Sequence, residues 1–110
     1  MSHRFARGLV VGKFSPLHRG HQRLIDHALA RCDELIAISW SKPEFRCCEV
    51  ANRERWLAEL DPAVKRVVID DAALERLCQQ RGIAARPLPR NDADDDTHRA
   101  FVAWLCTDLL

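Results

Sequence analysis

The sequence lacks a long apolar run, an excess of one charge and any paired spacing of cysteines. No stretch approaches the roughly 18 apolar residues that a membrane-spanning helix needs, and the N-terminus is too short and too polar for a signal peptide. Seventeen Lys and Arg balance sixteen Asp and Glu, a formal net charge of +1 that suggests neither a nucleic-acid nor a membrane partner. Five cysteines without C-x-x-C spacing argue against a disulfide framework and a zinc ribbon. We therefore expect a reduced cytoplasmic protein.

Length and composition indicate one globular domain over residues 1–110. A chain of 110 residues corresponds to a single core. A content of 47% hydrophobic and 30% charged residues is typical of a folded chain and not of a disordered one.

Buried-strand patterns alternate with helical patterns along the chain. The expected strands cover residues 9–11, 35–40, 67–69 and, weakened by two prolines, 85–88. The expected helices cover residues 18–31, 50–60, 72–80 and 97–110. The aspartates at 70 and 71 can cap the third helix, and Gly82 is a natural stop for it. This alternation predicts an α/β fold, a Rossmann-like parallel sheet with helices on both faces.

The segment from Gly12 to His21 follows the first expected strand and opens the first expected helix. In open parallel sheets, ligands bind beyond the carboxyl ends of the strands, and a helix N-terminus attracts phosphate through unpaired N–H groups and a partial positive charge. Glycine at positions 12 and 20 lets the backbone approach a ligand closely. The segment is neither a Walker loop nor the dinucleotide G-x-G-x-x-G.

Two histidines in this segment are the main candidates for phosphate contact. His18 and His21 are three residues apart, so both imidazoles lie on the same side of the first helical turn. Each can donate a hydrogen bond to a phosphate oxygen, more strongly when protonated, and Lys13 adds a mobile charge. The alternatives are a pair of surface or capping histidines, or a zinc site, for which no third ligand is near in sequence.

The segment resembles the G-x-F-x-P-x-H-x-G-H signature of the nucleotidylyltransferase superfamily. All six specified positions match, namely Gly12, Phe14, Pro16, His18, Gly20 and His21. The stretches N-R-E-R-W-L at 52–57 and D-T-H-R at 96–99 resemble nicotinamide-nucleotide adenylyltransferases of the bifunctional NAD-biosynthesis regulator type. The resemblance is strong over residues 8–40 and looser beyond.

The resemblance implies transfer of an adenylyl group from ATP, with Mg²⁺, to nicotinamide mononucleotide. It implies that His18, His21 and Lys13 are catalytic, and that the nucleotide is bound by Gly12, Phe14, Ser15 and Gly20. From their own positions in the sequence, Trp40 after the second expected strand and Arg46 and Arg53 near the second expected helix are candidates for substrate binding. The same signature serves pantetheine-phosphate adenylylation and cytidylyl transfer to choline or glycerol phosphates. A nucleotide-binding or regulatory remnant without turnover is a further alternative.

Several of these residues also have a simpler interpretation, as structural or solvent-exposed residues. Lys13 is also interpretable as a solvated loop residue, Phe14 as core, Trp40 as structural and the two arginines as solvated. Four aspartates at 92 and 94–96 resemble a metal cluster, but a solvated loop that ends in a helix cap explains them more simply.

The resemblance also implies a second signature, I-S-x-T-x-x-R, after the last strand of the family. Nothing in residues 1–110 matches it, so we expect a domain that is incomplete at its C-terminus and slow or inactive by itself. An unfinished sheet edge favours pairing with another chain, which leaves a homo-oligomer open.

Overall fold

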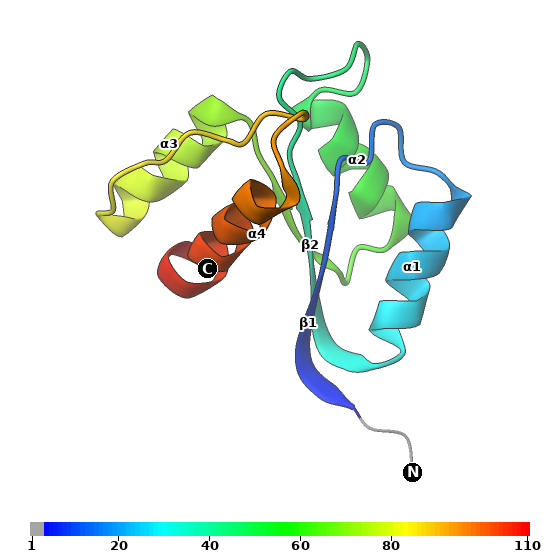
Figure 1. Ribbon diagram of the computed structural model, residues 1–110. Helices are drawn as coiled ribbons and strands as arrows, with labels where there is room; N and C mark the ends of the chain where they lie inside the picture. The colour runs from blue at the N-terminus through cyan, green and yellow to red at the C-terminus, as the bar shows by residue number, and fades with distance from the viewer. Residues whose placement is uncertain (1–3) are drawn as a thin grey trace. The chain divides into compact units, whose positions relative to one another are not determined.

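The computed structural model describes residues 4–110 and forms its elements in strict alternation at first (Figure 1). In chain order the described elements are β1 (Phe5–Gly12), α1 (Arg19–Leu29), β2 (Cys32–Ser39), α2 (Val50–Leu60), β3 (Lys65–Val68), α3 (Asp71–Arg81), α4 (Asp95–Trp104) and the π-helical turn η1 (Leu105–Leu109). The chain divides into two compact units, residues 4–40 with 44–68 and residues 41–43 with 69–110. Each unit is described by itself.

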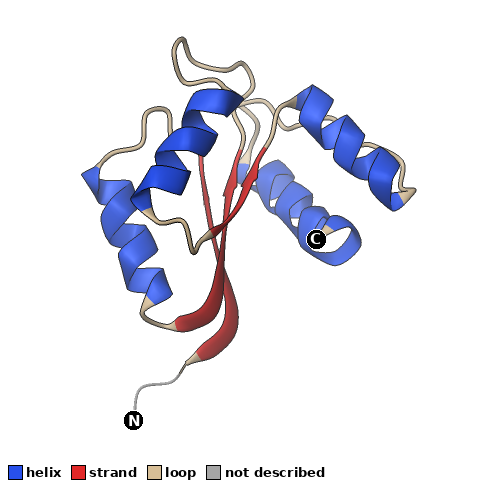
Figure 2. Cartoon of the chain, turned by 180° about the vertical axis from the view of Figure 1, so that it is seen from behind, coloured by secondary structure: helices blue, strands red, loops and turns tan. Residues whose placement is uncertain are grey.

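The first unit is a three-stranded parallel sheet in the order β1-β2-β3. Gly12 at the end of β1 lies opposite Ser39 at the end of β2, so the segments that follow both strands leave from the same edge. Parallel strands need long crossovers, and α1 and α2 provide them on one side of the strands (Figure 2). The expected α/β fold with a parallel sheet is confirmed.

The core of this unit lies between one sheet face and these two helices. Seven buried residues form it, which are Val10, Phe14, Ile25, Leu35, Ala37, Leu57 and Val64. The strand residues among them alternate with outward residues such as Leu9 and Val11, which are 45% and 40% exposed. The two-residue period of a strand explains this alternation.

The second unit contains α3, α4 and η1. Asp70 caps α3 by accepting a hydrogen bond from the Ala73 amide at 2.7 Å, and Gly82 ends it in the left-handed conformation with φ of 69°. Both expectations for this helix are confirmed. Left-handed backbone favours glycine because a Cβ would be strained there.

One strand is longer than the sequence predicts, and one predicted strand does not form, each for a physical reason. β1 extends from Phe5 instead of from residue 9, because its backbone pairs with β2 whether or not the side chains are apolar. The predicted strand at 85–88 is wrong, since these residues are irregular. Pro87 and Pro89 cannot donate to a ladder, and the Leu88 amide donates instead to the Asp71 carboxylate at 3.3 Å.

The last helix starts earlier than expected and changes its winding. α4 begins at Asp95, and its final turn widens into η1, where the Leu110 amide donates to the Leu105 carbonyl at 2.8 Å. The buried positions of α4 and η1 are Phe101, Trp104, Leu105 and Leu109, while Val102 is half-buried.

Two general observations complete the fold. Across residues 4–110, the helices are all too short or too polar to cross a membrane. The five cysteines, all in this described part, are free thiols.

Candidate nucleotide-binding site

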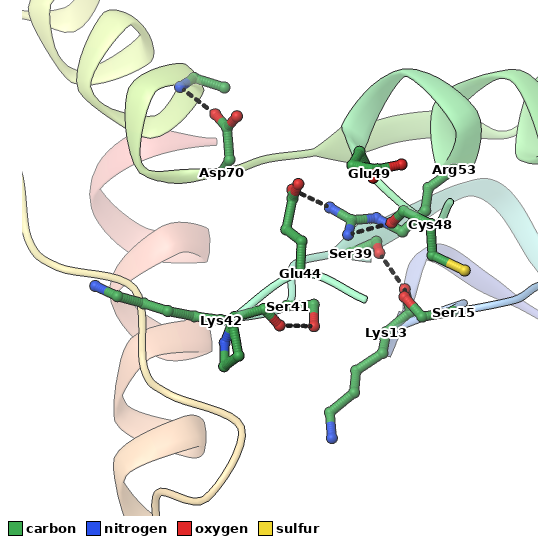
Figure 3. A network of polar contacts seen from close by, with 12 residues as sticks. Lys13, Ser15, Ser39, Ser41, Lys42, Glu44, Cys48, Glu49, Arg53 and Asp70 are labelled. Atoms are coloured by element: carbon green, nitrogen blue, oxygen red, sulfur yellow. Dashed lines mark hydrogen bonds and ion pairs between the residues drawn. The ribbon is translucent and has the colours of Figure 1, made fainter. Parts of the chain in front are cut away.

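The turn between β1 and α1 is tied to the neighbouring strand. Ser39, fully buried at the end of β2, donates through its hydroxyl to the Lys13 carbonyl at 2.9 Å (Figure 3). Ser15 donates to the same carbonyl at 3.0 Å. The turn therefore has a fixed path where it leaves the sheet, and the Lys13 side chain remains exposed.

Phe14 anchors the turn by placing its ring in the core. Its ring is 1% exposed and belongs to the core, and its backbone has a φ of 49°, unusual for a non-glycine residue. A Cβ on Gly12 would come within 3.0 Å of this ring. Gly12 therefore makes room for Phe14, whereas the sequence suggested room for a ligand, and only the Phe14 backbone remains to face a nucleotide.

His18 and His21 cap α1 reciprocally. The Gly20 amide donates to Nδ1 of His18 at 3.0 Å, and the His18 amide donates to Nδ1 of His21 at 3.2 Å. This arrangement is a capping box in which imidazoles replace the usual hydroxyl and carboxylate. The capping alternative considered from sequence is therefore part of the structure.

Capping also fixes which nitrogen of each ring can donate. Because Nδ1 accepts a backbone hydrogen bond, the proton of a neutral imidazole resides on Nε2. Burial, and then the charge of His18, lower the pKa of His21, which favours the neutral ring. The rings of His18 and His21 stack with centroids 3.7 Å apart and planes 21° apart. Two Nε2–H donors thus lie on neighbouring parallel rings.

Gly20 is required by the same arrangement. A Cβ at this position would lie 2.9 Å from Cε1 of the His18 ring, closer than real Cβ contacts. Larger residues would push the ring away from the amide that it caps. The second glycine of the signature therefore also serves a neighbouring side chain.

Positive charge at the start of α1 is uncompensated in the described part of the chain. The first turn of α1 contains no acidic residue, and neither Lys13 nor Arg19 forms an ion pair with another residue of the range 4–110. Both side chains are exposed. Arg19 was missed by the sequence interpretation, although its place between His18 and Gly20 was the signal.

The three expected substrate-binding residues differ in exposure. Trp40 is 6% exposed, which leaves little of its ring for stacking and supports its structural interpretation. Arg46 is exposed on the loop before α2. Arg53 is fully buried, and it donates to the Cys48 carbonyl at 3.0 Å and to the Glu44 carboxylate at 3.5 Å. Arg53 therefore holds this loop in the structure, and its expected substrate contact stays a prediction.

The aspartates near the C-terminal helix act as the simpler interpretation expected. Asp94 caps α4 by accepting hydrogen bonds from the Thr97 amide at 2.8 Å and the Thr97 hydroxyl at 2.7 Å. Those hydrogen bonds lower the pKa of Asp94. Asp92 and Asp96 pair with nearby arginines, and no cluster of three metal-ligating residues occurs within residues 4–110.

An open hollow of about 530 Å³ lies beside the signature in the first unit. Its lining is mostly apolar and consists of Pro16, Leu17, Trp56, Glu59 and Leu60. Neither of the capping histidines lines it, although Pro16 and Leu17 directly precede His18.

Comparison with known proteins gives one match. The model of the cytidylyltransferase-like family matches residues 9–103, and the chain belongs to this family. Its general function is therefore that of a nucleotidyltransferase. No curated protein and no solved structure matches the chain.

Proposed function

We propose that the chain binds the triphosphate of ATP at the start of α1 and serves adenylyl transfer to nicotinamide mononucleotide. Four features support the triphosphate position: two imidazole Nε2–H donors, an exposed lysine, an exposed arginine and the free end of a helix dipole. All come from the segment 13–21, at the edge of the sheet where ligands of such folds bind.

The reaction is a single displacement at phosphorus. A phosphate oxygen of the acceptor forms a bond to the α-phosphorus of ATP, the bond to the bridging oxygen of the β-phosphate breaks, and pyrophosphate leaves with the electron pair. Such chemistry rests on positioning and on neutralising the leaving group. His18 and His21 would donate to the departing phosphates, and Lys13 and Arg19 would offset their charge. Mg²⁺ arrives with ATP as part of the substrate.

The single observation that carries the proposal is that the two nitrogens of each imidazole have different hydrogen-bonding roles. Nδ1 is used by the fold, so Nε2–H is a donor whose orientation is already set before ligand arrives. Donors that need no reorganisation are worth more to a developing anion than mobile ones. A pair of surface histidines without a cap would lack this property.

The two tasks of His18 can be separated by substitution. His18→Asn keeps a side-chain acceptor for the Gly20 amide, because asparagine is among the preferred cap residues, but it removes Nε2–H. His18→Ala removes both. We expect His18→Asn to unfold at the wild-type temperature and to bind ATP about tenfold or more weakly, as for a lost hydrogen bond to a charged group. Isothermal titration and thermal unfolding measure the two effects.

The matched control is His27→Asn, which changes an exposed histidine in the last turn of the same helix. It should leave ATP affinity unchanged. Wild-type ATP affinity in His18→Asn, together with lower stability in His18→Ala, would make His18 a capping residue only and would overturn the proposal.

The acceptor is tested separately by pyrophosphate release. ATP and CTP are each combined with nicotinamide mononucleotide, phosphopantetheine, phosphocholine and glycerol 3-phosphate. We expect release with ATP and nicotinamide mononucleotide above the other pairs. Binding of ATP without release from any pair would favour the non-catalytic nucleotide-binding alternative.

A further inference from the structure

The solvent-facing side of α1 carries a line of basic side chains. The line, called the basic stripe below, consists of four exposed residues spaced by four positions, Arg19, Arg23, His27 and Arg31. Residues four apart on a helix are neighbours on one face, so the basic stripe runs for about 18 Å at 1.5 Å per residue. Ile25 faces the other way, into the core. The first unit therefore leaves the basic stripe uncovered.

Arg31 lies just beyond the end of α1 and extends the stripe. Its guanidinium donates to the His27 carbonyl at 3.0 Å and lies 3.1 Å from Nδ1 of the His27 ring. Its amide donates to the Ala28 carbonyl at 3.0 Å and closes the last turn. These contacts hold the guanidinium next to His27, in line with the arginines that precede it.

Little negative charge accompanies the basic stripe. Within residues 4–110, its three arginines form no ion pair. The acidic residue of α1, Asp26, forms none in this range either. Three arginines against one aspartate leave an excess of positive charge on this face.

A large apolar side chain stands beside these charges. Leu24 is 49% exposed, follows Arg23 directly and precedes His27 by three residues. Protein interfaces combine an apolar centre with arginine, whereas surfaces that bind a single nucleic-acid strand rely on aromatic rings for stacking. Residues 19–31 contain no Phe, Tyr or Trp. The composition of this face therefore favours a protein partner.

The second unit carries a surface of the opposite charge. Four of the five residues at 92–96 are exposed aspartates, and we call them the acidic segment. Only Asp94 accepts the capping hydrogen bond of α4. Asp92 and Asp96 pair with neighbouring arginines at 3.6 Å in solvent, where an ion pair contributes little. Asp95 forms no ion pair with any residue of the range 4–110.

We propose that the basic stripe of α1 binds the acidic segment of a second copy of this chain. Charge complementarity carries the proposal, because one surface has an excess of arginine, the other an excess of aspartate, and both are exposed. Leu24 supplies the apolar part of the contact. Since each copy has both surfaces, two copies can exchange the contact or a row of copies can repeat it. The contact differs from pairing at a sheet edge, which joins backbones and not charges.

The first test measures self-association by sedimentation at protein concentrations up to about 1 mM. A reductant is present because the five cysteines are free thiols. We expect the mean mass to rise with concentration in low salt. It should return towards that of a monomer in about 1 M salt, where the Debye length is about 3 Å.

Charge reversal then identifies the two surfaces. Arg23→Glu and Asp95→Arg should each weaken self-association about tenfold or more, because like charges then face each other across the contact. An equimolar mixture of the two variants should associate again, since opposite charges meet at every contact between them. The matched controls are Arg55→Glu and Asp108→Arg, which reverse exposed charges elsewhere in the same two units and should associate as the wild type does.

Thermal unfolding checks that each variant is folded. Asp95→Arg places a cation in the first turn of α4, where the helix dipole disfavours it. Asp92→Arg lies before the helix and takes its place if that variant does not fold. Leu24→Ala should weaken self-association by a similar factor at low and at moderate salt, as expected of an apolar contact.

Three results would overturn the proposal. The first is a wild type that stays monomeric over the whole concentration range, and the second is association that Arg23→Glu and Asp95→Arg leave unchanged. The third is weakened association that mixing the two variants does not restore, because the contact would then not join these two surfaces. Binding of a single-stranded DNA oligonucleotide by a monomeric wild type, lost in Arg23→Glu, would assign the basic stripe to nucleic acid instead.

Discussion

Helices α1 and α4 begin with the same kind of cap but with opposite electrostatics. In α1 the cap is His18, and the first turn has no acidic residue. In α4 the cap is Asp94, and Asp95 and Asp96 follow directly in the first turn. Both helices satisfy their first amides with a side chain, yet only α4 also compensates its positive dipole end with carboxylates.

The number of carboxylates in the first turn indicates which helix start favours an anion. Three carboxylates at the start of α4 stabilise that helix and repel phosphate. The start of α1 is satisfied in hydrogen bonds but not in charge, because imidazole nitrogens and not carboxylates cap it and Arg19 and Lys13 stand nearby. A capped helix start can therefore still attract an anion when the cap carries no negative charge.

The largest expected effect comes from making α1 resemble α4. Arg19→Asp places a carboxylate in the first turn of α1. We expect ATP affinity to fall about tenfold or more, because a cation is replaced by an anion within a Debye length of roughly 10 Å of the phosphates, while the unfolding temperature stays the same or rises. Titration at two salt concentrations measures the effect, which should shrink at the higher one.

The control for that change is Arg23→Asp, on the second turn of the same helix, where the charge is exposed and further from the helix start. It should cost clearly less affinity. Equal losses from the two substitutions would show that net charge, and not the start of α1, determines ATP binding.

The next effect concerns the caps themselves. Asp70→Ala removes the side-chain cap of α3, and His18→Ala removes that of α1. Each should lower the free energy of unfolding by about 1 kcal/mol, measured by urea denaturation. Only His18→Ala should also weaken ATP binding. If Asp70→Ala also bound ATP poorly, the loss could not be assigned to the start of α1 in particular, which would contradict the distinction between the helix starts.

A smaller effect is expected from reducing the acidity of α4. Asp96→Asn removes one first-turn carboxylate and its ion pair with Arg99. The free energy of unfolding should fall by about 0.3–1 kcal/mol, the usual contribution of a charge at a helix end. ATP affinity should not change. A gain in ATP affinity would contradict this and would show that the start of α4 also binds an anion once its negative charge is reduced.

The smallest effect separates the two caps by pH. Because the folded pKa of His21 is lowered from 6.5, the unfolded chain binds this proton more readily, so stability from His21 is full above pH 6.5 and declines as pH falls through the folded value. The pKa of Asp94 is lowered from 3.8, so its contribution persists until the pH falls through that lower value. NMR titration should show the His18 amide responding below pH 6.5 and the Thr97 amide only in strong acid. A His21 midpoint at or above 6.5 would contradict this ordering.

Much of the fold follows from local signals in the sequence. The apolar runs at β1, β2 and β3 are short and flanked by turn residues, and Asp70 and Gly82 mark the ends of α3 by side-chain and backbone chemistry that needs no tertiary contact. The strand-to-helix turn was located by its motif. The predicted strand at 85–88 does not form, because the two prolines prevent ladder hydrogen bonds although Leu88 is apolar.

The parts of the site that sequence did not predict depend on ring rotation and burial. Whether His18 presents Nδ1 or Nε2 to the backbone is decided by a side-chain torsion that spacing does not encode. For Arg53 the sequence suggested a substrate contact or, because arginine is usually exposed, a solvated position. Its partner Glu44 lies nine residues away in a loop without periodicity. Such contacts arise only once the loop and α2 are packed together.

The two-nitrogen use of His18 has a consequence for how descendants of this chain would diverge. Folding alone asks only for a cap, and asparagine, aspartate, serine and threonine all fill that position well. A lineage that no longer bound phosphate would be free to drift among these residues at position 18 while Gly20 relaxed with it, because a shorter cap no longer crowds that Cβ position. If Nε2 of His18 contacts a ligand, we expect both the imidazole and the glycine to be retained. Natural variation at these two positions would therefore test whether position 18 serves only as a helix cap.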